Sequence, residues 1–420
     1  MHVGLLVPPF QGHLNPFASL ARAFARSGHR ATLITLPDGR ARLREEDFEI
    51  RTYGEKLFPA GSFVATEARM GVLSGRAGAR AAIELTGAQC RAIFEELPPV
   101  LDALQLDLLV MDQVCVGAEC LAARRALPLG VACAALPLHR EVGVPPWTSL
   151  RAPSRSPLAK LRNAFDHARF FLGALPTFRT FSRLRREHGF PAMRPRDLHE
   201  IPPSRVQVCQ LPELLDFAHA KRPAHFHYTA PWVEAQRAST RDERFPWERL
   251  DGRPILYASL GTLQNRLDWI YDAIAEACRD LPYQLVLALG RERAAIPSLP
   301  GEPLVVGFAP QLELLQRASA VITHAGLNTA LETLRAGLPC VALPITHEQP
   351  GIAARLVHRV GSARALALRE LTPLALRAAL LEILEEPRYR AAAQRAAATL
   401  ATIDGPSLAA AALTRAAAPR

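Results

Sequence analysis

Residues 320–337 read AVITHAGLNTALETLRAG and join a short strand, a turn and a helix. The apolar run Ala320–Thr323 is typical of a buried strand, and Leu327–Ala336 has a helical pattern with Gly337 just past its end. Gly326 lies at the turn between them. A strand that turns through glycine into a helix directs backbone N–H groups and the positive end of the helix dipole at one point. The stretch therefore predicts an anion site suited to a pyrophosphate.

The same alternation of strands and helices extends over both halves of the chain. Apolar runs occur at 2–7, 30–35, 106–111, 129–134, 255–259, 284–289, 304–306, 320–323 and 340–343. A helix is expected at 16–27, with Asn15 as its N-cap and Pro16 at its first position, and another at 118–125. Such alternation predicts an α/β fold with parallel, doubly wound sheets.

The length and a change in composition predict two domains. A chain of 420 residues is too long for one ordinary core, and two domains of roughly 200 residues are the natural expectation. Polar, charged sequence with two prolines follows Trp232, which indicates a linker. We therefore expect domains at 1–235 and 254–405, a linker at 236–253 and a terminal helix at 406–420. Ligands of open α/β sheets bind outside the carboxyl ends of the strands, so the active site is expected between the sheets.

Several classes of protein are disfavoured. The seven cysteines form no CxxC pair, which argues for a reducing compartment and against a zinc site. No apolar run reaches the length of roughly 18 residues that a membrane span needs. The N-terminus lacks a basic head and predicts a first strand rather than a signal peptide, so a cytoplasmic location is expected. No GxGxxG follows the first strand, which disfavours a nicotinamide-binding protein.

The net charge of +10 is concentrated in one segment. Residues 151–196 contain eleven Arg or Lys, among them Arg183, Arg185 and Arg186, but only two acidic residues. The segment is predicted to be mostly helical, with breaks at prolines 176, 191 and 195. Because apolar clusters interleave with its charges, it fits peripheral contact with an anionic membrane, at the inner face, as well as a solvated helical face. No nucleic-acid partner is expected.

A histidine and an aspartate are expected at one sheet edge. His13 follows the first strand, and Asp112 ends the run at 106–111. Because both lie at the carboxyl edge of a parallel sheet, neighbouring strands can bring them together. The pKa of histidine near neutrality suits a general base, and an aspartate behind it can orient the ring and stabilise the imidazolium. A solvated histidine and a helix-capping aspartate are the alternatives. Asp107 is at the opposite edge.

The order of the second-half residues resembles the nucleotide-sugar signature of family 1 glycosyltransferases. The matching residues run, in order, Phe308-Ala309-Pro310-Gln311, His324-Ala325-Gly326-Leu327-Asn328, Glu332, Gly337-Leu338-Pro339 and Glu348-Gln349. A narrower resemblance, to bacterial carotenoid glucosyltransferases of the zeaxanthin glucosyltransferase type, rests on ALPLHRE at 135–141, on VPP at 144–146 and on QPGIAAR at 349–355.

This resemblance implies a GT-B fold, in which two Rossmann-like domains face each other across a cleft. The N-terminal domain would bind the acceptor and the C-terminal domain the nucleotide sugar, with the terminal helix crossing back to the first domain. The resemblance also implies that His13 and Asp112 are catalytic, as in inverting members. The acceptor pocket is expected at 55–90 and 140–200, where the family diverges.

For the donor site, the resemblance implies roles residue by residue. His324 would bind the diphosphate, with further donors from Gly326, Asn328 and Thr329 and further contacts from Ser259 and Thr262. Glu332, one helical turn past Asn328, would bind ribose hydroxyls. Phe308 would stack on the base, unless it is a core residue, and backbone near Gln311 would read the base edge. Glu348 and Gln349 would bind the sugar. No cofactor and no metal are expected, because the helix dipole and His324 can offset the charge of the leaving diphosphate.

The sequence thus predicts an inverting, metal-independent hexosyltransferase that moves glucose from UDP-glucose to a hydroxyl of an apolar acceptor, with a hydroxylated carotenoid such as zeaxanthin favoured. A macrolide or flavonoid O-glycosyltransferase using a UDP- or TDP-sugar is the alternative, and GDP is a further possible carrier. A UDP-sugar 2-epimerase and a non-catalytic glycosyltransferase-like partner protein are lesser alternatives. An epimerase would need several carboxylates and a second histidine in the cleft and would lack the Gln-Gly-His loop at 11–13, and a non-catalytic relative would lack His13 or the donor loop.

Overall fold

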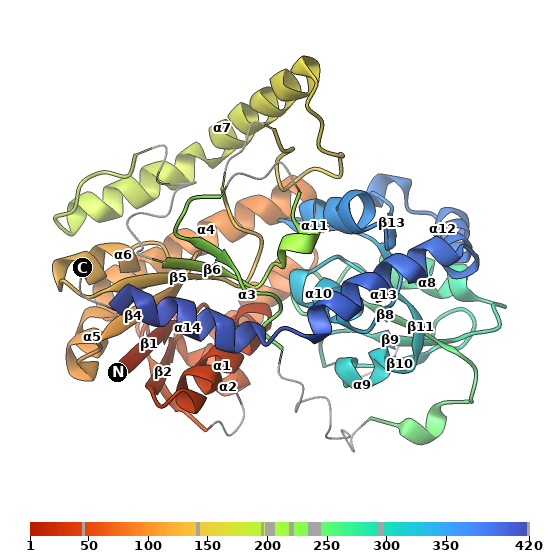
Figure 1. Ribbon diagram of the computed structural model, residues 1–420, viewed down its shortest axis with the longest axis horizontal. Helices are drawn as coiled ribbons and strands as arrows, with labels where there is room; N and C mark the ends of the chain where they lie inside the picture. Colours follow the sequence, from red (N-terminus) through yellow and green to blue (C-terminus); the bar gives the residue numbers. More distant parts are fainter. Residues whose placement is uncertain are drawn as a thin grey trace.

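The computed structural model describes residues 1–43, 47–139, 143–194, 197, 206–217, 222–233, 245–292 and 298–417. Two sheets, each covered by helices, lie side by side (Figure 1). All the strand pairings within both sheets are parallel, as the strand–helix alternation predicts. The boundary expected at 235 and the first half of the expected linker, residues 236–244, fall outside the described residues.

The first sheet contains seven strands in a doubly wound order. From edge to edge these are β3 (Glu49–Thr52), β2 (Arg30–Thr35), β1 (His2–Leu6), β4 (Leu108–Asp112), β5 (Leu129–Cys133), β6 (Val206–Cys209) and β7 (Phe226–Tyr228). Its helices are α1 (Gln11–Arg26), α2 (Pro37–Arg42), α3 (Ser62–Gly71), α4 (Gly75–Glu96), α5 (Pro98–Leu104), α6 (Ala118–Arg124) and α7 (Pro157–Glu187), with a short 3₁₀ turn η2 (Glu213–Leu215). The central strands are fully buried, as covered parallel strands are.

The second sheet contains six strands. Their order is β10 (Leu304–Val306), β9 (Gln284–Ala288), β8 (Ile255–Ser259), β11 (Ala318–Thr323), β12 (Cys340–Ala342) and β13 (Ala363–Ala365). The accompanying helices are α8 (Asp268–Cys278), α9 (Gln311–Leu315), α10 (Leu327–Arg335), α11 (Gln349–Arg355), α12 (Pro373–Glu385) and α13 (Pro387–Ala401), with short turns η4 (Trp247–Arg249), η5 (Leu356–Val360) and η6 (Leu368–Glu370).

The last helix, α14 (Gly405–Ala417), leaves the second sheet and packs on the first. Its Ala409 and Leu413 share a buried cluster with Val3 and Phe17. No single described helix is both long and apolar enough to cross a membrane, although α13 and α14 taken as a bent pair meet that test by length and composition.

Two helices differ from their expected boundaries. α1 begins at Gln11, so Asn15 is no N-cap, Pro16 is inside the helix and His13 belongs to the first helical turn rather than a loop. Proline lacks the N–H that would bond to the carbonyl four residues earlier, here that of Gly12. α7 runs through Pro176 without the predicted break; because Pro176 is exposed, water can bond to the carbonyl of Leu172 that the missing N–H leaves free.

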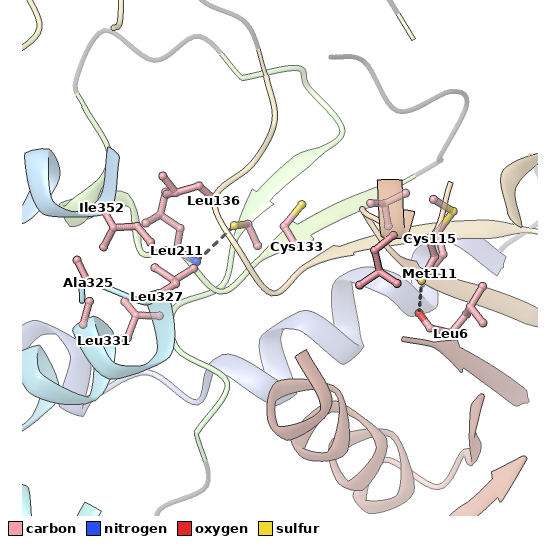
Figure 2. Packing of buried hydrophobic residues seen from close by; sticks show 14 of the residues in the cluster. Leu6, Met111, Cys115, Cys133, Leu136, Leu211, Ala325, Leu327, Leu331 and Ile352 are labelled. Carbon is pink, nitrogen blue, oxygen red and sulfur yellow. Dashed lines mark hydrogen bonds between the residues drawn. The ribbon is translucent and has the colours of Figure 1, made fainter. Parts of the chain in front are cut away.

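Hydrophobic packing continues from one sheet to the other. Figure 2 shows Leu6, Met111 and Cys133 of the first half in the same cluster as Leu327 and others of the second half, with Leu136 and Leu211 between them. A buried ion pair adds to this contact: the Arg355 guanidinium donates to the carboxylate of Asp216 at 2.8 Å and 3.0 Å. The two halves are therefore held in a defined relation around the space between them.

Candidate active site

A cavity of about 1270 Å³ lies between the two sheets and is lined by both. It lies where the strands end: His13 follows β1, Asp112 ends β4, Ser259 ends β8 and His324 follows β11. Every residue proposed from the sequence as a donor ligand lines this cavity, as does His13. The parallel topology thus places side chains from distant parts of the chain around one space, at the edge predicted for ligands.

His13 and Asp112 form the expected pair. Nδ1 of His13 lies 2.8 Å from Oδ2 of Asp112, and Oδ1 of the same carboxylate accepts the backbone N–H of Val114 at 3.0 Å. Asp112 is fully buried, so both its oxygens are held in place. With Nδ1–H donated to the carboxylate, Nε2 is left as the basic nitrogen. Asp107, by contrast, binds the N–H of His2 at the opposite edge of the sheet.

The electrostatics of His13 favour a base that accepts and holds a proton. Burial alone lowers the pKa of His13, but the charge of Asp112 and its hydrogen bond outweigh burial, so the pKa is raised. Glu348 adds to this from the other half of the molecule. Glu348 follows His347, whose φ of 54° is left-handed and turns the chain between β12 and α11 toward the cavity. The predicted sugar ligand Glu348 is therefore close enough to His13 to act on its charge.

The ring of His324 is held between two glycines. A Cβ on Gly261 would lie 2.6 Å from Cε1 of His324, and a Cβ on Gly326 would be closer still to the ring. Burial lowers the pKa of His324 to about 4, so the imidazole is neutral near pH 7. Its buried Nδ1 has no hydrogen-bond partner among the described residues. A neutral imidazole with an unused ring nitrogen at the start of α10 is suited to a diphosphate oxygen.

The side chains of Glu332 and Gln311 form a hydrogen bond. The amide Nε2 of Gln311 donates to Oε2 of Glu332, and its Oε1 accepts from the hydroxyl of Tyr257 at 3.1 Å. Burial raises the pKa of Glu332 to about 7. Thr329 lies 3.5 Å from the same Gln311 amide. The Gln311 side chain therefore orients Glu332, a role that the sequence did not predict.

Asn328 bridges the two halves. Its Nδ2 donates to the carbonyl of Gly12 at 2.8 Å, and its Oδ1 accepts from Gln210 at 2.8 Å. The Gly12 carbonyl is available because Pro16 cannot bond to it within α1. The Asn328 amide, which the sequence predicts to donate a hydrogen bond to phosphate, thus donates instead to the helix that contains His13. Its phosphate role stays a prediction.

The remaining predicted donor residues differ in exposure. Phe308 is 58% exposed at the cavity, which excludes the core alternative. Gln349 is buried, and its Oε1 accepts the backbone N–H groups of Ile345 and Thr346 at 2.8 Å and 2.9 Å. Its amide Nε2 donates one hydrogen to Gln264 at 3.4 Å, which leaves one amide hydrogen for a sugar. Ser259 is buried and accepts the N–H of Gly261 at 3.3 Å.

The acceptor side of the cavity is largely apolar. As expected, its walls come from α3, α4 and the segment that includes α7, and they contain Met70, Ile83, Leu85, Trp147, Phe170, Phe171 and Phe181. Sequence reasoning missed Gln210, which follows β6 at the same carboxyl edge as His13 and Asp112, although that position was a usable signal. Among the described residues, no group of three His, Cys, Asp or Glu side chains is placed to hold a metal ion.

Two parallel-sheet domains with a cavity between their carboxyl edges define the GT-B architecture, and the comparisons with known proteins agree with it. The profile of the family "UDP-glucoronosyl and UDP-glucosyl transferase" matches residues 249–402. A zeaxanthin glucosyltransferase of Pantoea ananas is 30% identical over 86% of this chain and 84% of its own. A second zeaxanthin glucosyltransferase, from Pseudescherichia vulneris, is 29% identical over 85% and 84%.

Solved structures show the same fold. The glycosyltransferase of kitacinnamycin superposes with a TM-score of 0.74, at 22% identity, over 99% of this chain and 98% of its own. The chain belongs to glycosyltransferase family 1. It is an enzyme that transfers a sugar, and its class binds a nucleotide-sugar donor and an acceptor.

Proposed function

We propose that this enzyme transfers glucose from UDP-glucose, with inversion, to a hydroxyl of an apolar acceptor, and that the acceptor is a hydroxylated carotenoid such as zeaxanthin. The observation that supports the proposal most is the His13–Asp112 pair, which borders the same cavity as the His324 turn and a long apolar wall. The zeaxanthin glucosyltransferases that this chain resembles support the acceptor class.

In the proposed reaction, Nε2 of His13 removes the proton of the acceptor hydroxyl as its oxygen attacks the anomeric carbon. The attack comes from the face opposite the diphosphate, so the bond to the diphosphate oxygen breaks in the same displacement and the anomeric configuration inverts. Asp112 stabilises the imidazolium that forms. His324 and the N-terminus of α10 stabilise the leaving diphosphate, and Glu332 binds the ribose.

We propose that stabilisation of the leaving diphosphate needs no metal ion. The helix dipole and a hydrogen bond from His324 act where the charge of the leaving diphosphate develops. We expect activity to persist in EDTA. Complete loss of activity in EDTA that magnesium restores would contradict this part of the proposal.

The deciding experiment incubates the enzyme with UDP-glucose or TDP-glucose and with a carotenoid diol, a flavonoid or a macrolide. The proposal expects a β-glucoside of the carotenoid from UDP-glucose, identified by mass and by the anomeric coupling constant in NMR. An α-linked product would contradict inversion. Faster transfer to the flavonoid or the macrolide, or from TDP-glucose, would favour the alternative natural-product function.

We also propose that α7 contacts the membrane in which such an acceptor dissolves. Leu158, Leu161, Phe165 and Leu172 are each at least 64% exposed, and at 3.6 residues per turn they fall within an arc of about 60° on one side of the helix. Arg162 and Arg169 are exposed beside them. The opposite side of the helix, with Phe171 and others, lines the cavity. An apolar stripe flanked by cations suits an anionic bilayer surface, and α7 lies at the outer edge of the molecule (Figure 1).

A further inference from the structure

Gln210 and Asn328 form an amide bridge between the two halves of the molecule, next to His13. Gln210, directly after β6, donates from Nε2 to Oδ1 of Asn328 at 2.8 Å. Nδ2 of Asn328 in turn donates to the carbonyl of Gly12 at 2.8 Å. Asn328 is in the first turn of α10 and Gly12 in the first turn of α1, and both residues line the cavity. The amide bridge therefore joins the helix starts that face each other across the cavity.

The direction of each hydrogen bond in the amide bridge is fixed at both ends. Nε2 of Gln210 also donates to the backbone carbonyl of Ala134, and the other end of the bridge is the carbonyl of Gly12. Carbonyl oxygens can only accept, so an exchanged amide at Gln210 or Asn328 would place two oxygens against each other. Gln210 is 1% exposed, so water does not substitute for its bonds. The amide bridge therefore has a single arrangement.

The first turn of α1 depends on this bridge because of Pro16. Proline has no N–H to offer to the carbonyl four residues earlier, so the bond that would hold Gly12 within the helix is missing. The residue before the helix, Phe10, supplies no side-chain cap. Asn328 replaces the missing bond from the other half of the molecule. The turn that contains His13 is thus held in part by the donor half.

The amide bridge acts on the location of His13 and not on its charge. Both amides are neutral, and Asp112 already orients the imidazole ring. His13 is the next residue after Gly12, and Asn328 belongs to the same turn as His324. A displacement reaction needs the base, the attacking oxygen and the leaving group in line, and an error of about 1 Å can cost about a hundredfold in rate.

We propose that Gln210 and Asn328 are positioning residues for sugar transfer, and that the amide bridge holds Nε2 of His13 at a fixed place relative to the diphosphate turn. Gln210 does so without touching a substrate, because it does not line the cavity. This positioning role rests on the proposed function, which assigns His13 as the base and the turn at 324–328 to the diphosphate.

The experiment compares Gln210→Leu with the matched control Gln207→Leu. Both remove a buried amide at β6, but the Gln207 amide donates to Sγ of Cys133 within the first half. Gln210→Leu should lower kcat about ten- to a hundredfold, with UDP affinity changed by less than about threefold and the acidic limb of the pH profile, which Asp112 sets, in place. Gln207→Leu should keep the wild-type kcat. Equal kcat in the two variants, or a loss confined to UDP affinity, would overturn the proposal.

Asn328→Ala breaks the amide bridge at its middle, and it is the second variant should Gln210→Leu fail to fold. Because both substitutions interrupt the same bridge, the double variant should be no slower in kcat than Asn328→Ala alone. Losses that multiply would show that the two side chains act independently, and would overturn the amide bridge.

Hydrogen exchange without substrate separates this inference from the proposed function. The backbone amides of residues 13–15 should exchange faster in Gln210→Leu and in Asn328→Ala than in the wild type and in Gln207→Leu. Unchanged exchange would overturn the amide bridge whatever the reaction proves to be. Full activity in His13→Ala, or no transfer from UDP-glucose by the wild type, would instead contradict the proposed function, and the exchange result would still decide whether the bridge holds α1.

Discussion

At the scale of single residues, the proposed chemistry is divided between the two halves of the cavity. His13 and Asp112 belong to the acceptor half, whereas His324 and Glu332 belong to the donor half. Loss of a catalytic base and loss of a nucleotide ligand should therefore be separable. A variant on one side should affect the reaction step, and a variant on the other should affect nucleotide binding.

His13→Ala should reduce the rate of transfer by about 10²–10⁴, because general-base catalysis typically contributes that much. Affinity for UDP should be nearly unchanged, since the nucleotide ligands are in the other half. Steady-state kinetics and UDP calorimetry on the same preparation measure the two effects. Retention of more than half the activity would rule out His13 as the base.

The pH dependence offers a test of Asp112. The base must be neutral to accept a proton, so kcat/KM should fall as the pH drops through the pKa of His13. Asp112 raises that pKa. In Asp112→Asn the carboxylate charge is gone, so the acidic limb should move to lower pH while the maximal rate decreases. A limb that stays at the wild-type pH would mean that Asp112 does not set the protonation of His13.

His324→Ala and Glu332→Ala should each weaken UDP binding about ten- to a hundredfold, since a hydrogen bond to a charged group is worth roughly 1.5–3 kcal/mol. Calorimetric titration with UDP measures the loss. His29→Ala, whose ring packs on Phe24 away from the cavity, is the control. Unchanged affinity in both donor-side variants would refute the donor site.

At the scale of elements, one side of α7 lines the cavity and the other side exposes an apolar stripe. The sequence marked Arg183, Arg185 and Arg186 as cations of this segment, but Arg185 is buried and cannot reach a lipid surface. The exposed positions beside the stripe are better probes. Which arginines of α7 are exposed depends on the side of the helix that packs against α4. A count of charges along the sequence does not show this.

Leu161→Ser combined with Phe165→Ser should reduce binding of the protein to vesicles that contain anionic lipid, because the apolar area available for insertion falls. Arg162→Gln combined with Arg169→Gln should weaken binding more at low salt than at high salt, since each cation near the surface contributes about 1 kcal/mol. Co-sedimentation measures both. Wild-type protein that stays in the supernatant at low salt would show that the face is only solvated, and a water-soluble acceptor would then be favoured.

At the scale of the whole molecule, contacts between the halves hold the cavity together. The buried Asp216 accepts from Arg355 across the interface and from Arg222 and Tyr228 within its own half. Burial raises the pKa of Asp216, but the two guanidinium groups outweigh burial and lower it to about 2. Its contribution to stability is therefore present above the unfolded pKa of about 3.9 and is lost as the pH falls toward 2.

Arg355→Met should lower the free energy of unfolding by about 3–5 kcal/mol, because removing one partner leaves a buried charge less compensated. Arg359→Met is the matched control, since Arg359 is exposed four positions further along the chain. Urea denaturation measures both. Equal midpoints for the two variants would show that the ion pair contributes nothing to stability.

Much of the fold was predictable because it depends on local patterns. Apolar runs that alternate with helices led to two parallel sheets, and His13 and Asp112, at the ends of β1 and β4, were expected at one edge of the first sheet. Boundaries were less predictable. The start of α1 was placed at Pro16, because proline favours the first position of a helix, whereas tertiary contacts supply a partner for the carbonyl that Pro16 leaves free.

The sequence by itself determined the family, the two sheets and the identity of the residues at their carboxyl edges, because strand periodicity and the glycine turn at 324–328 are local properties of the chain. Only the tertiary structure decided how those residues are used. The bond from Asn328 to Gly12 and the pairing of Gln311 with Glu332 each depend on elements far apart in sequence. Their physical basis is burial and partner geometry, which arise only when these elements pack together, and the Asn328–Gly12 bond also requires the two halves to meet.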